Sequence, residues 1–292
     1  MIFLKEDFSS GKFETGSLGS EKPWFYYEVP GFQAKDPASK ISVKSNKLTV
    51  DIPKYTLTTV GVHDHVKFLF FRNVMNKETG FPGFKVPERG SLYCETKASF
   101  KPFGTEKNPF DVPSDDYRLS SAISVNIDYD TFIVYDFVVA KTKIYALYER
   151  LPFDSKVKDP AAFFTYAMPV KDIEPGSEHK LKTVYDKSKY KLTWYVDDKK
   201  AFSLDEFGRR LSKDFDGCCV FNDQCGSGDP EKLPLVQSNQ RVYGMGLFTL
   251  LDAGARQNKE LVDIYDPKVP NEKNLFGQGG KFTISDFEVG TV

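Results

Sequence analysis

Apolar and polar residues alternate over short stretches along most of the chain, and Gly, Pro, Asn and Asp separate these stretches. A period of two residues is typical of β-strands with one buried face. The stretches that predict strands are residues 47–52, 64–71, 90–100, 118–127, 132–139, 144–151, 163–168, 178–185, 190–197, 200–203, 245–251 and 281–289. Helical periodicity is nearly absent, and only residues 204–211 predict a short helix. The sequence therefore predicts an all-β protein, an antiparallel β-sandwich of the jelly-roll type.

The spacing of the strands also predicts the domain organisation. Because sandwiches routinely reach this length as one unit, we expect a single domain over residues 1–292. Residues 75–88, 103–116 and 216–240 contain Pro and Gly and little periodicity, so they predict long loops. Loops of this length in a compact sandwich are often functional, and we expect them to rim the concave face.

The central pair of predicted strands, residues 132–139 and 144–151, contains two acids among β-branched and aromatic residues. Asp136 and Glu149 each stand where the pattern otherwise has an apolar residue. A half-buried carboxylate is costly unless it has a partner or a function. These two acids are therefore the first candidates for catalytic chemistry.

Two registers of this hairpin remain open. With a two-residue link, Asp136 lies opposite Leu147 and diagonal to Glu149 on the same face, and the two carboxylates lie roughly 7–8 Å apart at the backbone. At that separation the acids influence each other's pKa values. With a three-residue link, Asp136 instead faces Tyr148 and forms a buried network with Arg150, and Glu149 turns away.

A second candidate constellation lies at residues 63–67. On a strand, His63, His65 and Lys67 share one face. Two histidines at i and i+2 can bind a metal or supply an acid/base group near neutral pH. Because Lys67 lies beside them, the pattern disfavours a metal ion and favours an anionic or carbonyl-bearing ligand; exposed polar residues at a strand start are the alternative.

Aromatic residues on the predicted central strands provide a third candidate. Some form the core, and those on the concave face can stack on a sugar ring or another flat molecule. These residues are Tyr93, Tyr135, Tyr145, Tyr148, Tyr166, Trp194 and Tyr195. Glu95 follows Tyr93 at i+2 and is expected on the same face. Asp223 and Asp229 lie in a Gly-containing loop that can hold calcium, although such loops are common.

Charge and composition exclude several classes of function. The 40 basic and 41 acidic residues nearly cancel and form no basic cluster, so nucleic acid is not an expected partner. The chain has no apolar run long enough to span a bilayer, and the four apolar residues at its start are too few for a signal-peptide core. We therefore expect a cytoplasmic protein.

The four cysteines, Cys94, Cys218, Cys219 and Cys225, are expected to be free thiols in that compartment. Their spacing matches no usual zinc pattern. Phosphate-binding loops, dinucleotide fingerprints and nucleophile elbows are absent from the sequence, and we expect no metal and no organic cofactor.

Several motifs, in their order along the chain, resemble one superfamily. These are Glu6-Asp-Phe8, Trp24 and residues 47–50, 179–185, 191–198 and 281–288. Their order is similar to that of the concanavalin A-like lectins and glucanases, a resemblance that implies a jelly roll. More narrowly, residues 64–67, 145–153, 179–185 and 244–252 resemble an intracellular jelly-roll family of unknown function, which implies a fold and no reaction.

The chain departs from the glucanases of that superfamily at their catalytic strand. Those enzymes have three acids in the pattern Glu-x-Asp-x-Glu, which projects all three onto the concave face. The nearest match here is Asp128-Tyr-Asp130, and position 132 is Phe. Glycoside hydrolysis is therefore only a third interpretation.

The sequence favours an enzyme that moves protons on a small, largely apolar or carbonyl-bearing substrate, of the isomerase, cyclase or lyase type. A lectin-like module that binds a carbohydrate or small molecule without turnover is the alternative. The catalytic candidates are His65, Asp136, Tyr148 and Glu149. The substrate-binding candidates are His63, Lys67, Tyr93, Glu95, Tyr135, Arg150, Trp194 and Tyr195. The expected partner is a small molecule, with neither nucleic acid nor membrane.

Overall fold

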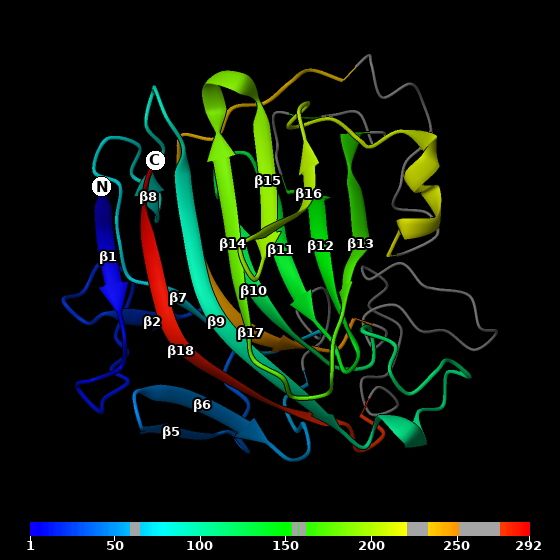
Figure 1. The fold of residues 1–292 in the computed structure, drawn as a ribbon. Helices are drawn as coiled ribbons and strands as arrows, with labels where there is room; N and C mark the ends of the chain where they lie inside the picture. The colour runs from blue at the N-terminus through cyan, green and yellow to red at the C-terminus, as the bar shows by residue number, and fades with distance from the viewer. Residues whose placement is uncertain (59–64, 154–156, 158–161, 221–232, 251–274) are drawn as a thin grey trace.

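Two antiparallel β-sheets stacked face to face make up the protein (Figure 1). The computed structural model describes residues 1–292 except 59–64, 154–156, 158–161, 221–232 and 251–274. We call the two sheets sheet A and sheet B.

Sheet A contains the N-terminal strand and the C-terminal strand side by side. In spatial order its strands are β16 (Lys199–Leu204), β15 (Lys191–Val196), β14 (His179–Asp186), β9 (Leu92–Phe103), β18 (Gly279–Thr291), β6 (Lys47–Ile52) and β5 (Lys40–Lys44). The strand β1 (Ile2–Glu6) pairs with the last part of β18. The α-amino group of Met1 donates a 2.7 Å hydrogen bond to the carbonyl of Thr291, which holds the two termini together.

Sheet B carries the central hairpin. In spatial order its strands are β13 (Phe164–Asp172), β12 (Lys143–Arg150), β11 (Ile133–Val139), β10 (Ser121–Ile127), β17 (Gln240–Phe248), β7 (Val66–Arg72) and β2 (Trp24–Tyr26), and β8 (Phe84–Lys85) pairs with β17. A separate small hairpin joins β3 (Glu28–Val29) and β4 (Phe32–Gln33). Every strand pair is antiparallel, and strands distant in sequence lie side by side, so the predicted β-sandwich of the jelly-roll type is confirmed.

The main core lies between the sheets. Trp194 on β15 is fully buried there, and its indole N–H donates a 3.0 Å hydrogen bond to the backbone carbonyl of Asp136 on β11. This bond links sheet A to sheet B at the strand that carries the candidate acid. Tyr135, Tyr148 and Tyr185 pack in the same layer.

A second apolar layer covers the outer face of sheet B. Strands β10, β11 and β17 are buried at nearly every position, on both faces. An antiparallel strand with a solvent-facing side normally alternates apolar with polar residues. The outer layer, which includes Phe71, Val125, Val134 and Leu147, is therefore a second packed surface.

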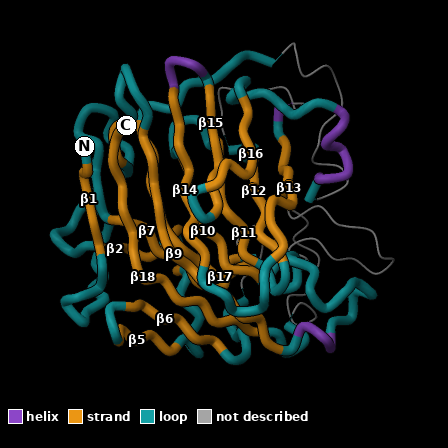
Figure 2. Tube along the Cα trace, viewed as in Figure 1, coloured by secondary structure: helices purple, strands orange, loops and turns teal. Residues whose placement is uncertain are grey.

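The helix predicted over residues 204–211 is wrong. Within the described residues, helices are limited to three short 3-10 segments, η1 (Thr105–Lys107), η3 (Lys187–Lys189) and η4 (Lys213–Cys218), drawn in purple in Figure 2. Residues 205–211 instead turn beneath the core, where Phe207 is fully buried. Gly208 has a φ of 99° and donates its N–H to the Tyr148 hydroxyl at 2.7 Å, and this left-handed conformation ends any helix.

The hairpin between β11 and β12 has the first of the two predicted registers. Asp136 pairs with Leu147, and Val134 pairs with Glu149. The link is tight, because the N–H of Ala140 donates to the carbonyl of Lys143 at 2.9 Å. Asp136 and Glu149 therefore lie diagonally on one face, the outer face of sheet B.

The prediction of four free thiols is wrong, because Cys219 is disulfide-bonded. Cys94 and Cys218 are free, and Cys225 lies outside the described residues. Free thiols were expected because a cytoplasmic location was expected, and the disulfide does not fit that expectation, since disulfides persist in oxidising compartments. No helix within the described residues is long and apolar enough to cross a membrane.

Candidate active site on the outer face of sheet B

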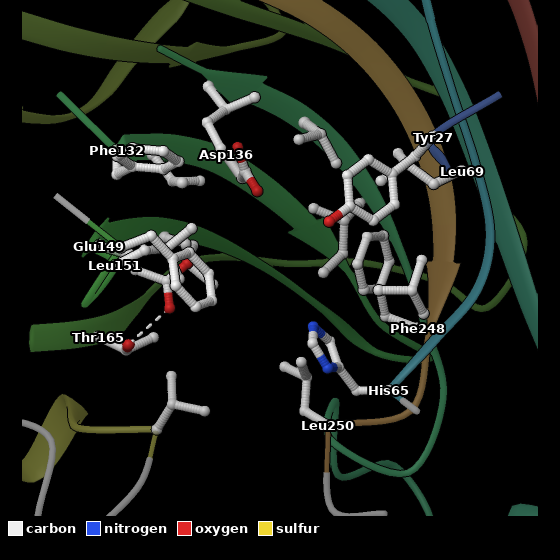
Figure 3. Close-up of a pocket in the computed structure, with 18 of the residues that line it drawn as sticks. Tyr27, His65, Leu69, Phe132, Asp136, Glu149, Leu151, Thr165, Phe248 and Leu250 are labelled. Carbon is white, nitrogen blue, oxygen red and sulfur yellow. Dashed lines mark hydrogen bonds between the residues drawn. The ribbon is translucent and has the colours of Figure 1, made fainter. Parts of the chain in front are cut away.

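A cavity of about 170 Å³ lies on the outer face of sheet B. Its size is close to the roughly 150 Å³ of an engineered protein cavity that binds benzene. Most of its wall is apolar, with Leu69, Ile123, Val125, Val134, Leu147 and Phe248 among the lining residues. Asp136, Glu149 and His65 all line this one cavity (Figure 3).

Asp136 lies on β11 at the floor of the cavity and is only 5% exposed. The pairing of β10 with β11 is interrupted beside it, and the backbone N–H of Asn126 donates to Oδ1 of Asp136 at 2.7 Å. Burial raises the pKa of Asp136 well above its usual value; the Asn126 hydrogen bond lowers the pKa, the charge of Glu149 raises it and that of Arg241 lowers it. Because burial dominates, the site favours the protonated acid.

Arg241 supports this arrangement from the opposite face of the sheet. Its guanidinium is fully buried between the sheets and lies 4.0 Å from the centroid of the Tyr135 ring. It donates to the side-chain oxygen of Asn126 at 2.7 Å and to the Asn126 carbonyl at 2.6 Å. Arg241 therefore holds Asn126 in place, and the backbone N–H of Asn126 is the donor that binds Asp136.

Glu149 lies on β12, diagonal to Asp136. Its Oε1 accepts a 2.7 Å hydrogen bond from the hydroxyl of Thr165, its directly paired residue on β13. Burial raises the pKa of Glu149 to about 7, and the Thr165 hydrogen bond lowers it by a smaller amount. Glu149 can therefore accept or release a proton close to neutral pH.

His65 enters the cavity from the opposite side. Figure 3 shows its ring beside Phe248 and Leu250, across the cavity from Glu149. The His65 and Phe248 rings are 6.0 Å apart, and the carbonyl of His65 accepts the N–H of Thr249 at 3.0 Å. Three of the four catalytic candidates thus converge, from β11, from β12 and from the turn just before β7.

Aromatic rings form a continuous side of the cavity. Tyr27 contacts Phe71 at 6.4 Å between ring centroids, Phe71 contacts Tyr129 at 6.4 Å, and Tyr129 contacts Phe132 at 6.5 Å. Phe132 in turn contacts Phe153 at 5.9 Å. We call these five residues the aromatic wall. Tyr27 turns its hydroxyl toward the middle of the cavity (Figure 3).

Four predicted site residues lie between the sheets and do not line the cavity. Tyr135, Tyr148 and Trp194 belong to the main core. Arg150 is buried and donates to the carbonyl of Gly208 at 3.4 Å. In the observed register Tyr135, Tyr148 and Arg150 are the strand neighbours of Asp136 and Glu149. They project from the opposite face of sheet B, because successive side chains of a strand alternate in direction.

Three other predicted residues lie on sheet A. Tyr93 and Glu95 flank the core residue Cys94 on β9, so they project from the outer face of that sheet, as Tyr195 does beside Trp194. The Tyr93 hydroxyl donates to Glu288 at 2.6 Å, and Glu95 forms an ion pair with Lys180 at 3.1 Å. The structure does not bring these residues together with the acids.

Of the remaining candidates, only Lys67 lies within the described residues. Lys67 lies on the outer face of sheet B but is fully buried outside the cavity, where its ammonium donates to the carbonyl of Leu57 at 3.1 Å. His63, Asp223 and Asp229 lie outside the described residues. Within the described part of the chain, no cluster of His, Cys, Asp and Glu has the geometry of a metal site.

The sequence reasoning missed Tyr27, Tyr129, Phe132 and Thr165 as lining residues. One local signal existed: β10, β11 and β17 are apolar on both faces, which marks a sheet covered on both sides. Tyr27 carries no such signal, because its position over the sheet follows from the tertiary pairing of β2 with β7.

Comparisons with known proteins give a family and leave the reaction open. A model of the family described as "Family of unknown function (DUF6081)" matches residues 5–292. The chain is 32% identical over 124 residues to the "Uncharacterized protein L829" of Acanthamoeba polyphaga mimivirus, a match that covers 39% of this chain and only 26% of the viral protein.

The chain is also similar, at low identity, to solved structures. SCLam, a non-specific endo-beta-1,3(4)-glucanase from family GH16, is 10% identical with a TM-score of 0.46, over 99% of this chain and 90% of that chain. The exolytic PL7 alginate lyase AlyA5 from Zobellia galactanivorans is 9% identical with a TM-score of 0.47, over 87% of this chain and 86% of that chain. These similarities concern the fold alone.

Proposed function

The chain belongs to the DUF6081 family, a family of unknown function, and we propose that the cavity on sheet B is the active site of an enzyme that transfers protons on a small, largely apolar substrate. The observation that supports this proposal most is the convergence of Asp136 and Glu149 in one apolar cavity. Acids kept partly protonated by burial are the usual way in which proteins run acid/base chemistry near neutral pH.

The two acids have complementary roles in this proposal. Glu149, as carboxylate, removes a proton from a substrate carbon next to a carbonyl group. Asp136, as neutral acid, donates a hydrogen bond or its proton to the carbonyl oxygen, on which the negative charge develops. Return of a proton to a different carbon gives isomerisation, and loss of a leaving group gives elimination. His65, on the facing side, is the third group able to carry a proton.

Deuterium exchange at a carbon acid tests this proposal. Phenylacetone has a ring that suits the apolar wall and a methylene group acidified by its carbonyl. In heavy water, we expect the protein to accelerate exchange of that methylene, as followed by proton NMR. Glu149→Gln should lower the acceleration at least about 100-fold, the usual contribution of a general base. Glu206→Gln, at a 63% exposed surface side chain, is the matched control and should leave it unchanged.

A module that binds a small molecule without turnover is the second candidate, favoured by the aromatic wall. Exchange no faster than in buffer, with phenylacetone shown to be bound, would support the binding module and contradict the enzyme. A carbohydrate ligand is less well supported, because sugar hydroxyls need more polar partners than this cavity wall presents.

A further inference from the structure

The charged groups around the cavity are unequal in sign. Asp136 and Glu149 line it, and within the described residues neither forms an ion pair with lysine or arginine. Lys67, which from the sequence favoured an anionic ligand, directs its ammonium to the carbonyl of Leu57 outside the cavity. Arg241 directs its guanidinium to Asn126, on the opposite face of the sheet. Among the described lining residues, a ligand therefore meets two acids and no lysine or arginine.

The aromatic wall has the same electrostatic preference. An aromatic ring carries negative charge on its faces and attracts a cation placed over it. Phe71, Tyr129 and Phe132 follow one another edge to face, with interplanar angles of 76° and 77°. Aromatic side chains grouped around one space bind quaternary ammonium groups in other proteins.

We propose that the ligand of this cavity is a small organic cation, an aryl or alkyl amine in its ammonium form, whose charged head lies between Asp136 and Glu149 and whose apolar body packs on the aromatic wall. This inference rests on the proposed function, because the same cavity then holds the substrate. An ammonium head would place a positive charge beside both acids, whereas the charge of Arg241 acts on Asp136 from the opposite face of the sheet.

The acids give such binding a characteristic pH dependence. An ammonium group needs at least one carboxylate, and burial raises the pKa of Glu149 to about 7. Below pH 7, binding must therefore drive a proton off Glu149, and affinity for the amine should fall as the pH falls. The titratable groups that face Glu149 across the cavity are Asp136, His65, Tyr27 and Tyr129. An uncharged ligand displaces no proton in this way.

The experiment compares four probes of similar shape: benzylamine, benzyl alcohol, toluene and benzoate. Each is titrated into the full chain by calorimetry at pH 6 and pH 8, in two buffers with different ionisation enthalpies. At pH 8 we expect benzylamine to bind at least tenfold more tightly than toluene and benzoate not to bind. At pH 6 benzylamine should bind about tenfold more weakly than at pH 8 and release close to one proton.

Two variants make the test specific. Glu149→Gln should abolish the proton release at pH 6, and Glu206→Gln on the surface should leave it unchanged. The proposal of a cationic ligand is wrong if toluene or benzoate binds as tightly as benzylamine, or if the amine binds without proton release. Either result still leaves a ligand site for the proposed enzyme. If no probe binds to the folded protein, the proposed cation ligand is wrong, and the phenylacetone exchange experiment decides separately whether the proposed active site is wrong.

Discussion

Asp136 and Glu149 link the free energy of folding to pH, because Asp136 is buried and Glu149 half-buried among apolar residues of sheet B. For an acid whose pKa is raised by folding, the folded chain holds its proton more tightly than the unfolded chain. Stability is then fully present below the unfolded pKa and falls as the pH rises through the folded pKa. Ionisation of the two acids of the cavity therefore lowers the stability of the folded protein as the pH rises toward neutral.

Glu149→Gln should remove part of this pH dependence. The pKa of Glu149 is raised from 4.5 to about 7, so the wild type loses stability between pH 5 and pH 8 as this group ionises. The variant cannot ionise there and should gain up to about 3 kcal/mol relative to the wild type over that range. Chemical denaturation at pH 5 and pH 8 measures this, and the pH 5 comparison is the internal control. If the free energy of unfolding of the variant differs from that of the wild type by the same amount at pH 5 and at pH 8, the pKa of Glu149 is not raised.

Asp136 also has a structural role that substitution can separate from its charge. Asp136→Asn keeps an oxygen that accepts the Asn126 N–H, whereas Asp136→Leu leaves that buried N–H without its acceptor. The Leu variant should be less stable than the Asn variant by about 1–3 kcal/mol. Hydrogen exchange of the Asn126 amide should be faster in the Leu variant. Equal exchange rates in the two variants would show that the carboxylate does not hold this peptide.

The sequence predicted the two acids as site residues but did not predict which residues surround them. Asp136, Glu149 and His65 could be found because polar residues interrupt an apolar pattern. Alternation shows which residues of one strand share a face, but not which face is the cavity. Tyr93 and Tyr195 therefore lie on sheet A, and Tyr148 lies on the inner face of sheet B, although the sequence grouped all three with the acids.

Among the elements, β17 makes room for the cavity wall with two glycines. A Cβ on Gly246 would lie 2.4 Å from the backbone oxygen of Phe68 and 2.7 Å from the ring of Phe248, which lines the cavity. A Cβ on Gly244 would meet the Phe70 oxygen at 2.0 Å and the Phe71 ring at 2.6 Å. The aromatic rings of the outer layer thus occupy the space that side chains of β17 would fill.

Gly246→Ala should therefore damage both stability and ligand binding. The nearest atom to the new methyl group belongs to the backbone of β7, so the strands must shift, at a cost of about 1–3 kcal/mol. Gly217→Ala is the matched control, because nothing lies within 4 Å of its added Cβ. Thermal denaturation of both variants, with benzylamine titration, measures the effect. Equal stability of the two variants would contradict the close packing of β17 against β7.

Long strands with clear alternation could be predicted from the sequence, and short strands could not. The long strands β9, β14 and β18 were predicted within a few residues, because their alternation is clear. The short edge strands β2 and β8 were missed, since two or three residues carry no period and their pairing with β7 and β17 is a tertiary contact. The helix over residues 204–211 failed because the burial of Phe207 and the turn at Gly208 outweighed a weak local periodicity.

The whole molecule is a sandwich with a second apolar layer on the outer face of sheet B. Sheet A carries ion pairs on its outer face, such as Lys97 with Asp286, whereas sheet B carries the cavity. Antiparallel order and a jelly-roll arrangement followed from many short strands and nearly absent helical periodicity. The apolar faces of β10, β11 and β17 indicate a sheet covered on both sides, but the covering residues could not be predicted, because Tyr27, Val220 and Leu250 reach the outer face of sheet B from distant parts of the chain.

Thiol content tests the covalent structure of the whole chain. The sequence has four cysteines and Cys219 is disulfide-bonded, so the denatured protein without reductant should titrate with two thiols, and with four after reduction. The count should be made on freshly purified protein with thiols blocked during denaturation, which prevents exchange. Four thiols before reduction would show that the disulfide does not form.

The protonation of the two acids is the central claim, and carbon-13 NMR of their carboxyl groups measures it most directly. Spectra of protein labelled at Asp and Glu carboxyl carbons, recorded from pH 4 to pH 9, can be assigned with Asp136→Asn and Glu149→Gln. We predict that Glu149 titrates with a pKa of about 7 and that Asp136 stays protonated well above the usual range of an aspartic acid. Titration of both carboxyl groups near pH 4 would contradict the account, because the cavity would then hold two ordinary carboxylates.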